Sequence, residues 1–147
     1  MIRTIHILSA SIALLTIASF WTASILSEVF ASHDTVALIK ASILQGMLLL
    51  IPAMATAGIT GNLLGKGWRL PVVAQKTRRM KIIAANGLLL LLPSAVFLAM
   101  RAQDGQFDSL FYAVQTLELV AGAVNITLLS LNMKAGMALR TRRMQRS

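Results

Sequence analysis

The sequence predicts an all-α membrane protein: a four-transmembrane-helix antiparallel bundle, in which two hairpins are joined by a basic cytoplasmic loop. The chain of 147 residues is 56% hydrophobic and only 13% charged, which is too apolar for the surface of a soluble domain of this size. Its apolar residues form segments of about twenty or more, the length that crosses a hydrocarbon core of roughly 30 Å. Basic side chains gather at the borders of these segments. The length suits one integral membrane domain, residues 1–147.

The first hairpin is expected to contain helices over about residues 5–30 and 36–64. The first apolar segment is too long for the core of a signal peptide, so we expect it to be retained. Pro52 removes one backbone hydrogen bond and should kink the second helix. Small residues spaced by four permit close helix contact there; they are Ala53, Ala57, Gly61 and Gly65.

The middle of the chain, Gly65–Lys81, is a long polar interruption without an acid, and we expect a loop there. Its cations are Lys66, Arg69, Lys76, Arg78, Arg79 and Lys81. The tail adds further arginines, among them Arg140, Arg142 and Arg143. Cations at membrane borders predict binding of anionic lipid headgroups. Because this explains the net charge of +9, no nucleic-acid partner is expected.

The second hairpin is expected over about residues 82–100 and 109–139, with a bend at Pro93. The last helix is longer than a span requires, so it should tilt or project from the bilayer. An excess of Lys and Arg marks the cytoplasmic face. Both termini and the central loop are therefore expected in the cytoplasm, and the two short turns outside, in a bacterial inner membrane.

Six positions of the last helix recur at spacings of three and four, which places them on one face. They are Gln115, Glu118, Gly122, Asn125, Leu129 and Asn132. Polar groups on such a face are costly in lipid, so the stripe should face other helices or a water-filled cavity. Two interpretations stay open: a polar pathway or ligand site, and hydrogen bonds between helices that fix their packing.

Lys40 lies about one turn inside its helix and has two possible orientations. It can extend outward to the membrane surface, or bend toward Glu118. In the second case an outer-leaflet polar cluster would contain Glu28, Lys40, Gln45, Gln115 and Glu118. Such a cluster is either a structural pairing or a substrate site.

The sequence contains few features of a metal-binding site or of an enzyme active site. The chain has no cysteine, and no phosphate-binding loop, zinc-protease or nucleophile-elbow motif occurs. His6 and His33 fall roughly 40 Å apart along a helix, so they cannot ligate one iron within a monomer. One axial histidine with a methionine, or with a second subunit, stays open. We expect no catalytic residue, metal or cofactor.

Two segments resemble known membrane proteins. The opening His6-Ile-Leu-Ser-Ala and the stretch Val120-Ala-Gly-Ala-Val-Asn-Ile-Thr-Leu-Leu-Ser-Leu-Asn132-Met are similar to small uncharacterised bacterial four-helix membrane proteins. The opening also resembles small four-helix b-type haem membrane proteins, whose partner histidines are missing here.

Three functions are compatible with these observations. The first is a non-enzymatic accessory or self-associating membrane subunit, with lipids, further copies or a membrane protein as partners. The second is an oligomeric small-solute or proton-coupled transporter that uses Glu118. The third is a haem- or quinone-binding redox component.

Overall fold

The computed structural model describes residues 1–67 and 70–144, with side chains through residue 138. These residues form α1 (Ile2–Phe30), α2 (His33–Gly65), α3 (Pro71–Asn86), a π-helical turn η1 (Gly87–Leu91), α4 (Leu92–Gln103) and α5 (Ser109–Met144). Because α3, η1 and α4 follow one another without a break, they make one span. The prediction of four helices, each long and apolar enough to cross a membrane, is confirmed.

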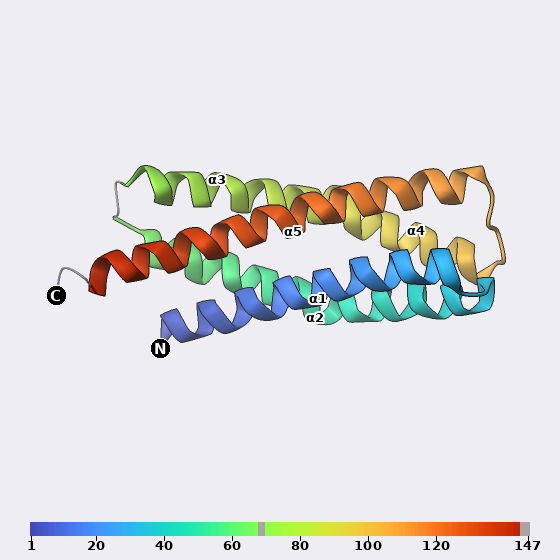
Figure 1. Ribbon diagram of the computed structural model, residues 1–147, viewed down its shortest axis with the longest axis horizontal. Coiled ribbons are helices and arrows are strands. Elements are labelled where there is room, and N and C mark those ends of the chain that lie inside the picture. The colour runs from blue at the N-terminus through green and yellow to red at the C-terminus, as the bar shows by residue number, and fades with distance from the viewer. Residues whose placement is uncertain (68–69, 145–147) are drawn as a thin grey trace.

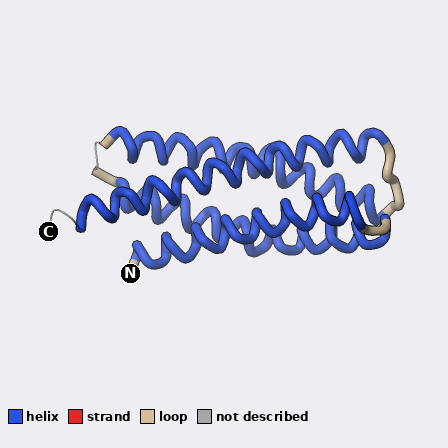
Figure 2. The backbone as a smooth tube through the Cα atoms, viewed as in Figure 1, coloured by secondary structure: helices blue, strands red, loops and turns tan. Residues whose placement is uncertain are grey.

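The four spans lie side by side along the long axis of the molecule (Figure 1). The start of α1, the end of α2, the start of α3 and the end of α5 lie at one end of the bundle, and the two short connections lie at the other. Figure 2 shows that the loops are confined to these two ends. The helix α1 packs against α2 and α5, and the span from α3 to α4 packs against α5 and, mainly through α4, against α2.

The apolar core has two parts. The larger one runs through the middle of the bundle and takes side chains from every span, such as Ile17, Ile43 and Leu129. The smaller one closes the end of the bundle near the short connections, around Val36, Leu98 and Phe111. The close contact predicted for the small residues of α2 is present: Ala53 and Ala57 are buried, Gly61 adjoins His6, and Gly65 adjoins Val73.

The polar middle of the chain is mostly helix rather than the expected loop. The helix α3 begins at Pro71, about eleven residues before the expected start at Ile82. Proline suits the first turn of a helix because its missing N–H would have no partner there, and the lysines, arginines and methionine that follow are good helix formers. The cations from Lys76 to Lys81 therefore stand on a helix.

The bend predicted at Pro93 is present, because Figure 1 shows α4 running at an angle to α3. Between them, the backbone N–H of Leu92 donates to the carbonyl of Gly87, five residues earlier. Pro93 has no N–H for the carbonyl of Leu89 and its ring crowds that carbonyl, so the π turn widens the helix just before it. Pro52 lies within a continuous α-helix, and a kink there stays a prediction.

Candidate functional site

An ion pair between the two hairpins lies inside the bundle. The Nζ of Lys40 on α2 is 2.7 Å from Oε2 of Glu118 on α5, and only 1% of the Lys40 side chain is exposed. The same Nζ donates to the Ser24 hydroxyl on α1 at 3.2 Å. Lys40 therefore bends inward to Glu118 and does not extend to the membrane surface.

Gln115 and Glu28 belong to the same polar region but are only partly bonded. Gln115 Nε2 donates to Oε2 of Glu118 at 3.4 Å. The other amide atom, Gln115 Oε1, is buried and accepts no hydrogen bond, and the same holds for Glu28 Oε1. Both atoms are acceptors that lack a hydrogen-bond partner.

Gln45 does not join this cluster, and its expected place there is wrong. Its side chain is exposed on the outside of the bundle. Five residues separate it from Lys40, which turns it roughly 140° around the helix axis from the inward face. The amide therefore lies on the outer surface of the bundle.

A small cavity of about 40 Å³ adjoins the ion pair on its inner side. Its walls are mostly apolar, with Ser24 and Glu118 as polar members. Trp21 also borders it and donates its indole N–H to the Leu119 carbonyl at 2.8 Å. A methyl group at Gly122 would come 2.9 Å from the Trp21 ring, so glycine is needed for this contact. The cavity has room for water but not for a solute of several heavy atoms.

The amides of the α5 stripe bond across to the third span. Asn86 Nδ2 donates to Oδ1 of Asn125 at 2.8 Å and to the Ala121 carbonyl at 2.8 Å. Asn125 Nδ2 in turn donates to the Ile83 carbonyl, and Asn132 Nδ2 to the Lys76 carbonyl, each at 3.3 Å. The prediction that the stripe faces inward is confirmed, since all six of its positions are buried.

The histidines lie in different settings at opposite ends of the bundle. His6 Nδ1 is 3.0 Å from the Ala57 carbonyl and 3.2 Å from the Thr60 hydroxyl. His33 is exposed at the start of α2 and stacks on Phe107, with ring centroids 4.0 Å apart. Across the described residues no group of three His, Asp or Glu side chains is placed to hold a metal ion.

Comparison of this chain with protein-family models, curated proteins and solved structures finds no match.

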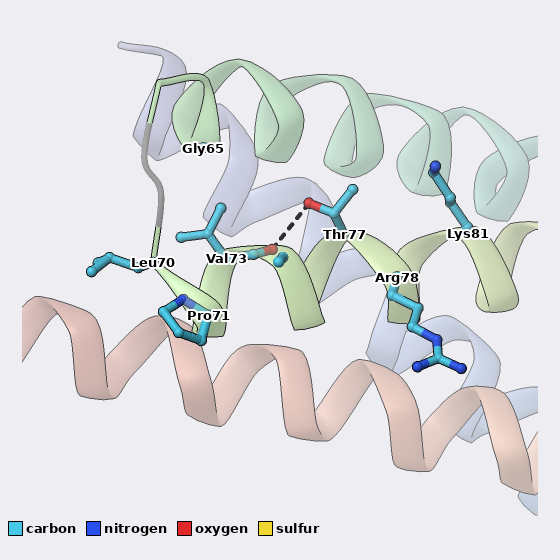
Figure 3. Close-up of a pocket in the computed structure, with 8 residues that line it drawn as sticks. Gly65, Leu70, Pro71, Val73, Thr77, Arg78 and Lys81 are labelled. Atoms are coloured by element: carbon cyan, nitrogen blue, oxygen red, sulfur yellow. Dashed lines mark hydrogen bonds between the residues drawn. The ribbon is translucent and has the colours of Figure 1, made fainter.

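Two cations of the basic end, Arg78 and Lys81, line a shallow groove. The groove measures about 570 Å³ and is lined by Gly65, Leu70, Pro71, Val73, Ala74, Thr77, Arg78 and Lys81. Figure 3 shows Arg78 and Lys81 extending from α3 in different directions. Lys66 is exposed nearby, while Lys76 and Arg79 are partly buried. Arg69 and the side chains of Arg140, Arg142 and Arg143 lie outside the described residues.

The opposite end carries a capped turn. Asp108 accepts a hydrogen bond from the Phe111 backbone N–H at 3.0 Å, which caps α5, and pairs with Arg101 at 2.7 Å. The hydrogen bond from Phe111, with the nearby positive charge of Arg101, lowers the pKa of Asp108 below its ordinary value. This carboxylate is therefore ionised through the physiological pH range.

Ser24, Trp21 and Asn86 are site residues that sequence reasoning missed. Trp21 lies deeper than interfacial tryptophans usually do, and Asn86 interrupts an apolar segment. Both positions were signals of an inward polar contact. Ser24 had no such signal, because it is one of several serines in α1.

Proposed function

We propose that this chain is a non-enzymatic, multi-pass membrane subunit that self-associates through the outward face of α2. Its two hairpins form an antiparallel bundle whose basic end faces the cytoplasm of a bacterium, and the cations of that end bind anionic lipid headgroups. The orientation is supported by the one-sided distribution of Lys and Arg.

The observation that carries the proposal is the exposure of Gln45. Gln45 lies four residues, or roughly 6 Å, from the midpoint of α2, and so close to the centre of the bilayer. Polar side chains at that depth almost always face protein or water, because hydrocarbon offers no hydrogen bonds. A single chain in lipid leaves the Gln45 amide without partners.

A second copy is the partner that suits this amide best. The amide carries two donors and one acceptor, so two copies of Gln45 can bond reciprocally across a twofold axis. The rest of the exposed stripe is compatible with close packing: Ser42 donates its hydroxyl to the Leu38 carbonyl of its own helix, and Leu38 and Leu49 are apolar. Gln45 is thus the polar group of this stripe that needs a partner from outside.

The interior supports the two other functions less well. Its polar groups are largely bonded to one another, and the cavity beside Glu118 is small for a transported solute. His6, the histidine suggested as a haem ligand, is bonded within the bundle by α2.

The absence of native cysteine allows a direct test by cross-linking. A single Leu49→Cys variant in liposomes should form a disulfide-linked dimer, since Leu49 lies one turn from Gln45 on the same stripe. A Leu15→Cys variant, exposed on α1, is the control and should stay monomeric.

Introducing Gln45→Leu into the Leu49→Cys variant should weaken self-association about three- to thirty-fold. This is the range expected for the loss of a hydrogen bond between membrane helices. Ser42→Ala should leave it unchanged. Equal association with and without Gln45 would refute the proposal. Loss of cross-linking in pure liposomes but not in native membranes would point to a different membrane protein as the partner.

A further inference from the structure

The groove beside α3 combines charged and apolar side chains along one helix face. Ala74, Arg78 and Lys81 line it at spacings of four and three, which places them on the same side of α3. Arg78 and Lys81 bring positive charge to the part of the groove nearer the apolar segment, and Leu70 and Pro71 bring apolar surface to the other part. A ligand that suits this groove therefore carries negative charge and also has apolar parts.

The positive charge of the groove is not neutralised within the part of the chain that the structure describes. None of the five acidic residues of the sequence lines the groove, and neither Arg78 nor Lys81 forms an ion pair with a described residue. Both side chains are exposed. The Thr77 hydroxyl, by contrast, already donates to the Val73 carbonyl at 3.1 Å (Figure 3). The two cations are therefore available to an anionic ligand.

Small residues shape the groove. A methyl group at Gly65 would come 3.0 Å from Cγ1 of Val73, so glycine lets the end of α2 lie close to α3. Ala74 is exposed and leaves space in front of the helix. The volume of about 570 Å³ falls in the range of small-molecule sites. A large side chain at Ala74 would fill part of this space without changing any charge.

The two cations lie at the depth of lipid phosphates. The apolar segment of this span begins at Ile82, and each headgroup layer of a bilayer is roughly 5–8 Å thick. By the helix rise, Lys81 and Arg78 lie roughly 2 and 6 Å outside Ile82, within that layer. Leu88, seven residues after Lys81 and so on the same face, is exposed to the acyl-chain region. The groove is thus continuous with a surface for acyl chains.

We propose that this groove binds one anionic phospholipid per chain. Residues three apart are neighbours on a helix surface, so rotation of the exposed Arg78 and Lys81 side chains brings both to one phosphate. The uncharged end of the headgroup lies over Ala74, whereas the cation of a choline headgroup would be repelled. The inference rests on the proposed function for the position of the basic end at the membrane surface. It adds one defined site to a general attraction between cations and anionic lipids, and it does not depend on self-association.

Native mass spectrometry of the full-length protein in detergent counts the lipids bound to each chain. One phosphatidylglycerol should be retained in preference to phosphatidylcholine. Arg78→Gln combined with Lys81→Gln should weaken this binding about thirty-fold, the effect of removing two surface cations. The control is Arg3→Gln combined with Lys134→Gln, which removes the same charge from exposed positions outside the groove and should change binding by less than about three-fold.

A steric variant tests the groove without altering its charge. Ala74→Phe should weaken phosphatidylglycerol binding, because the ring occupies the space of the headgroup. Gln75→Phe places the same ring on an exposed neighbouring position outside the groove and should leave binding unchanged.

Three results would overturn the site. Equal weakening by the two charge variants, with no effect of Ala74→Phe, would show diffuse attraction. Equal retention of phosphatidylcholine would remove the role of the cations. Displacement of the lipid by soluble glycerol phosphate at equal concentration would assign the groove to a soluble phosphate compound. The cross-linking of Leu49→Cys should be the same in all these variants, so its failure would refute self-association alone.

Discussion

Lys40 and Glu118 give up contact with water and pair with each other inside the bundle. Removing two charges from water costs free energy that their attraction offsets only with good geometry. Loss of one member should therefore destabilise the fold more than loss of both, because a lone buried charge is the most costly state.

Glu118→Leu should lower the free energy of unfolding by about 3–5 kcal/mol, since it leaves the Lys40 ammonium unpaired. The double variant Lys40→Met with Glu118→Leu should recover much of that loss. Glu118→Gln should have an intermediate effect, because the amide keeps the hydrogen bond without the charge. Chemical denaturation in detergent measures all three, and equal stability of the single and double variants would contradict the expectation.

The sequence predicts part of this site, for a clear reason. Spacings of three and four define one helix face, so the inward direction of Gln115 and Asn125 followed from the chain alone. The contact between Lys40 and Glu118 could not be predicted from the chain. These residues are 78 positions apart, and only the packing of α2 on the second hairpin brings them together. Gln45 lies near Lys40 in sequence, but five residues turn it roughly 140° around the helix axis, so it is outside the cluster in which it was predicted.

At the scale of the helices, the third span joins a polar part, α3, to an apolar part, η1 and α4. Hydropathy identifies only the apolar segment of this span. The helix α3 also includes the charged residues that precede this segment, back to Pro71, and their low hydropathy led to the prediction of a loop. The π turn at η1 was not predicted either. Pro93 indicated a bend but not how the backbone would accommodate it.

A π turn is equivalent to one residue inserted into an α-helix. Deleting Leu89 together with Pro93→Ala should therefore give a continuous α-helix that keeps Ile83 and Ala95 inside, with a thermal midpoint close to that of the wild type. Deleting Leu128 in the regular helix α5 is the control. It rotates the following residues by roughly 100°, moves Asn132 out of the interior and should prevent folding. Equal damage from both deletions would contradict this account of η1.

At the scale of the whole molecule, the number of spans followed from hydrophobic length, which depends only on the bilayer. The contacts between particular spans could not be predicted from hydrophobic length, because helix packing depends on side-chain shape. The contacts of Trp21 with Gly122 and of His6 with Gly61 join residues that lie far apart in the sequence.

The proposed orientation is testable with reporters. A reporter fused after Ser147 should be cytoplasmic, and one inserted between Asp104 and Gly105 should be external, because Lys and Arg are concentrated at the end of the bundle where α1 begins and α5 ends. Neutralising only Arg78 and Lys81 should leave the orientation intact, since many cations remain. A Ser147 fusion that reads external would contradict the topology.

The Lys40–Glu118 contact also has a consequence for biosynthesis. The ribosome completes the first hairpin well before it reaches Glu118, so Lys40 enters the membrane before its partner exists. During that interval the ammonium group must stay at the water boundary or in the insertion machinery, and the hairpin cannot settle at its final depth. Only the arrival of the last helix supplies the carboxylate that pairs with Lys40 inside the bundle.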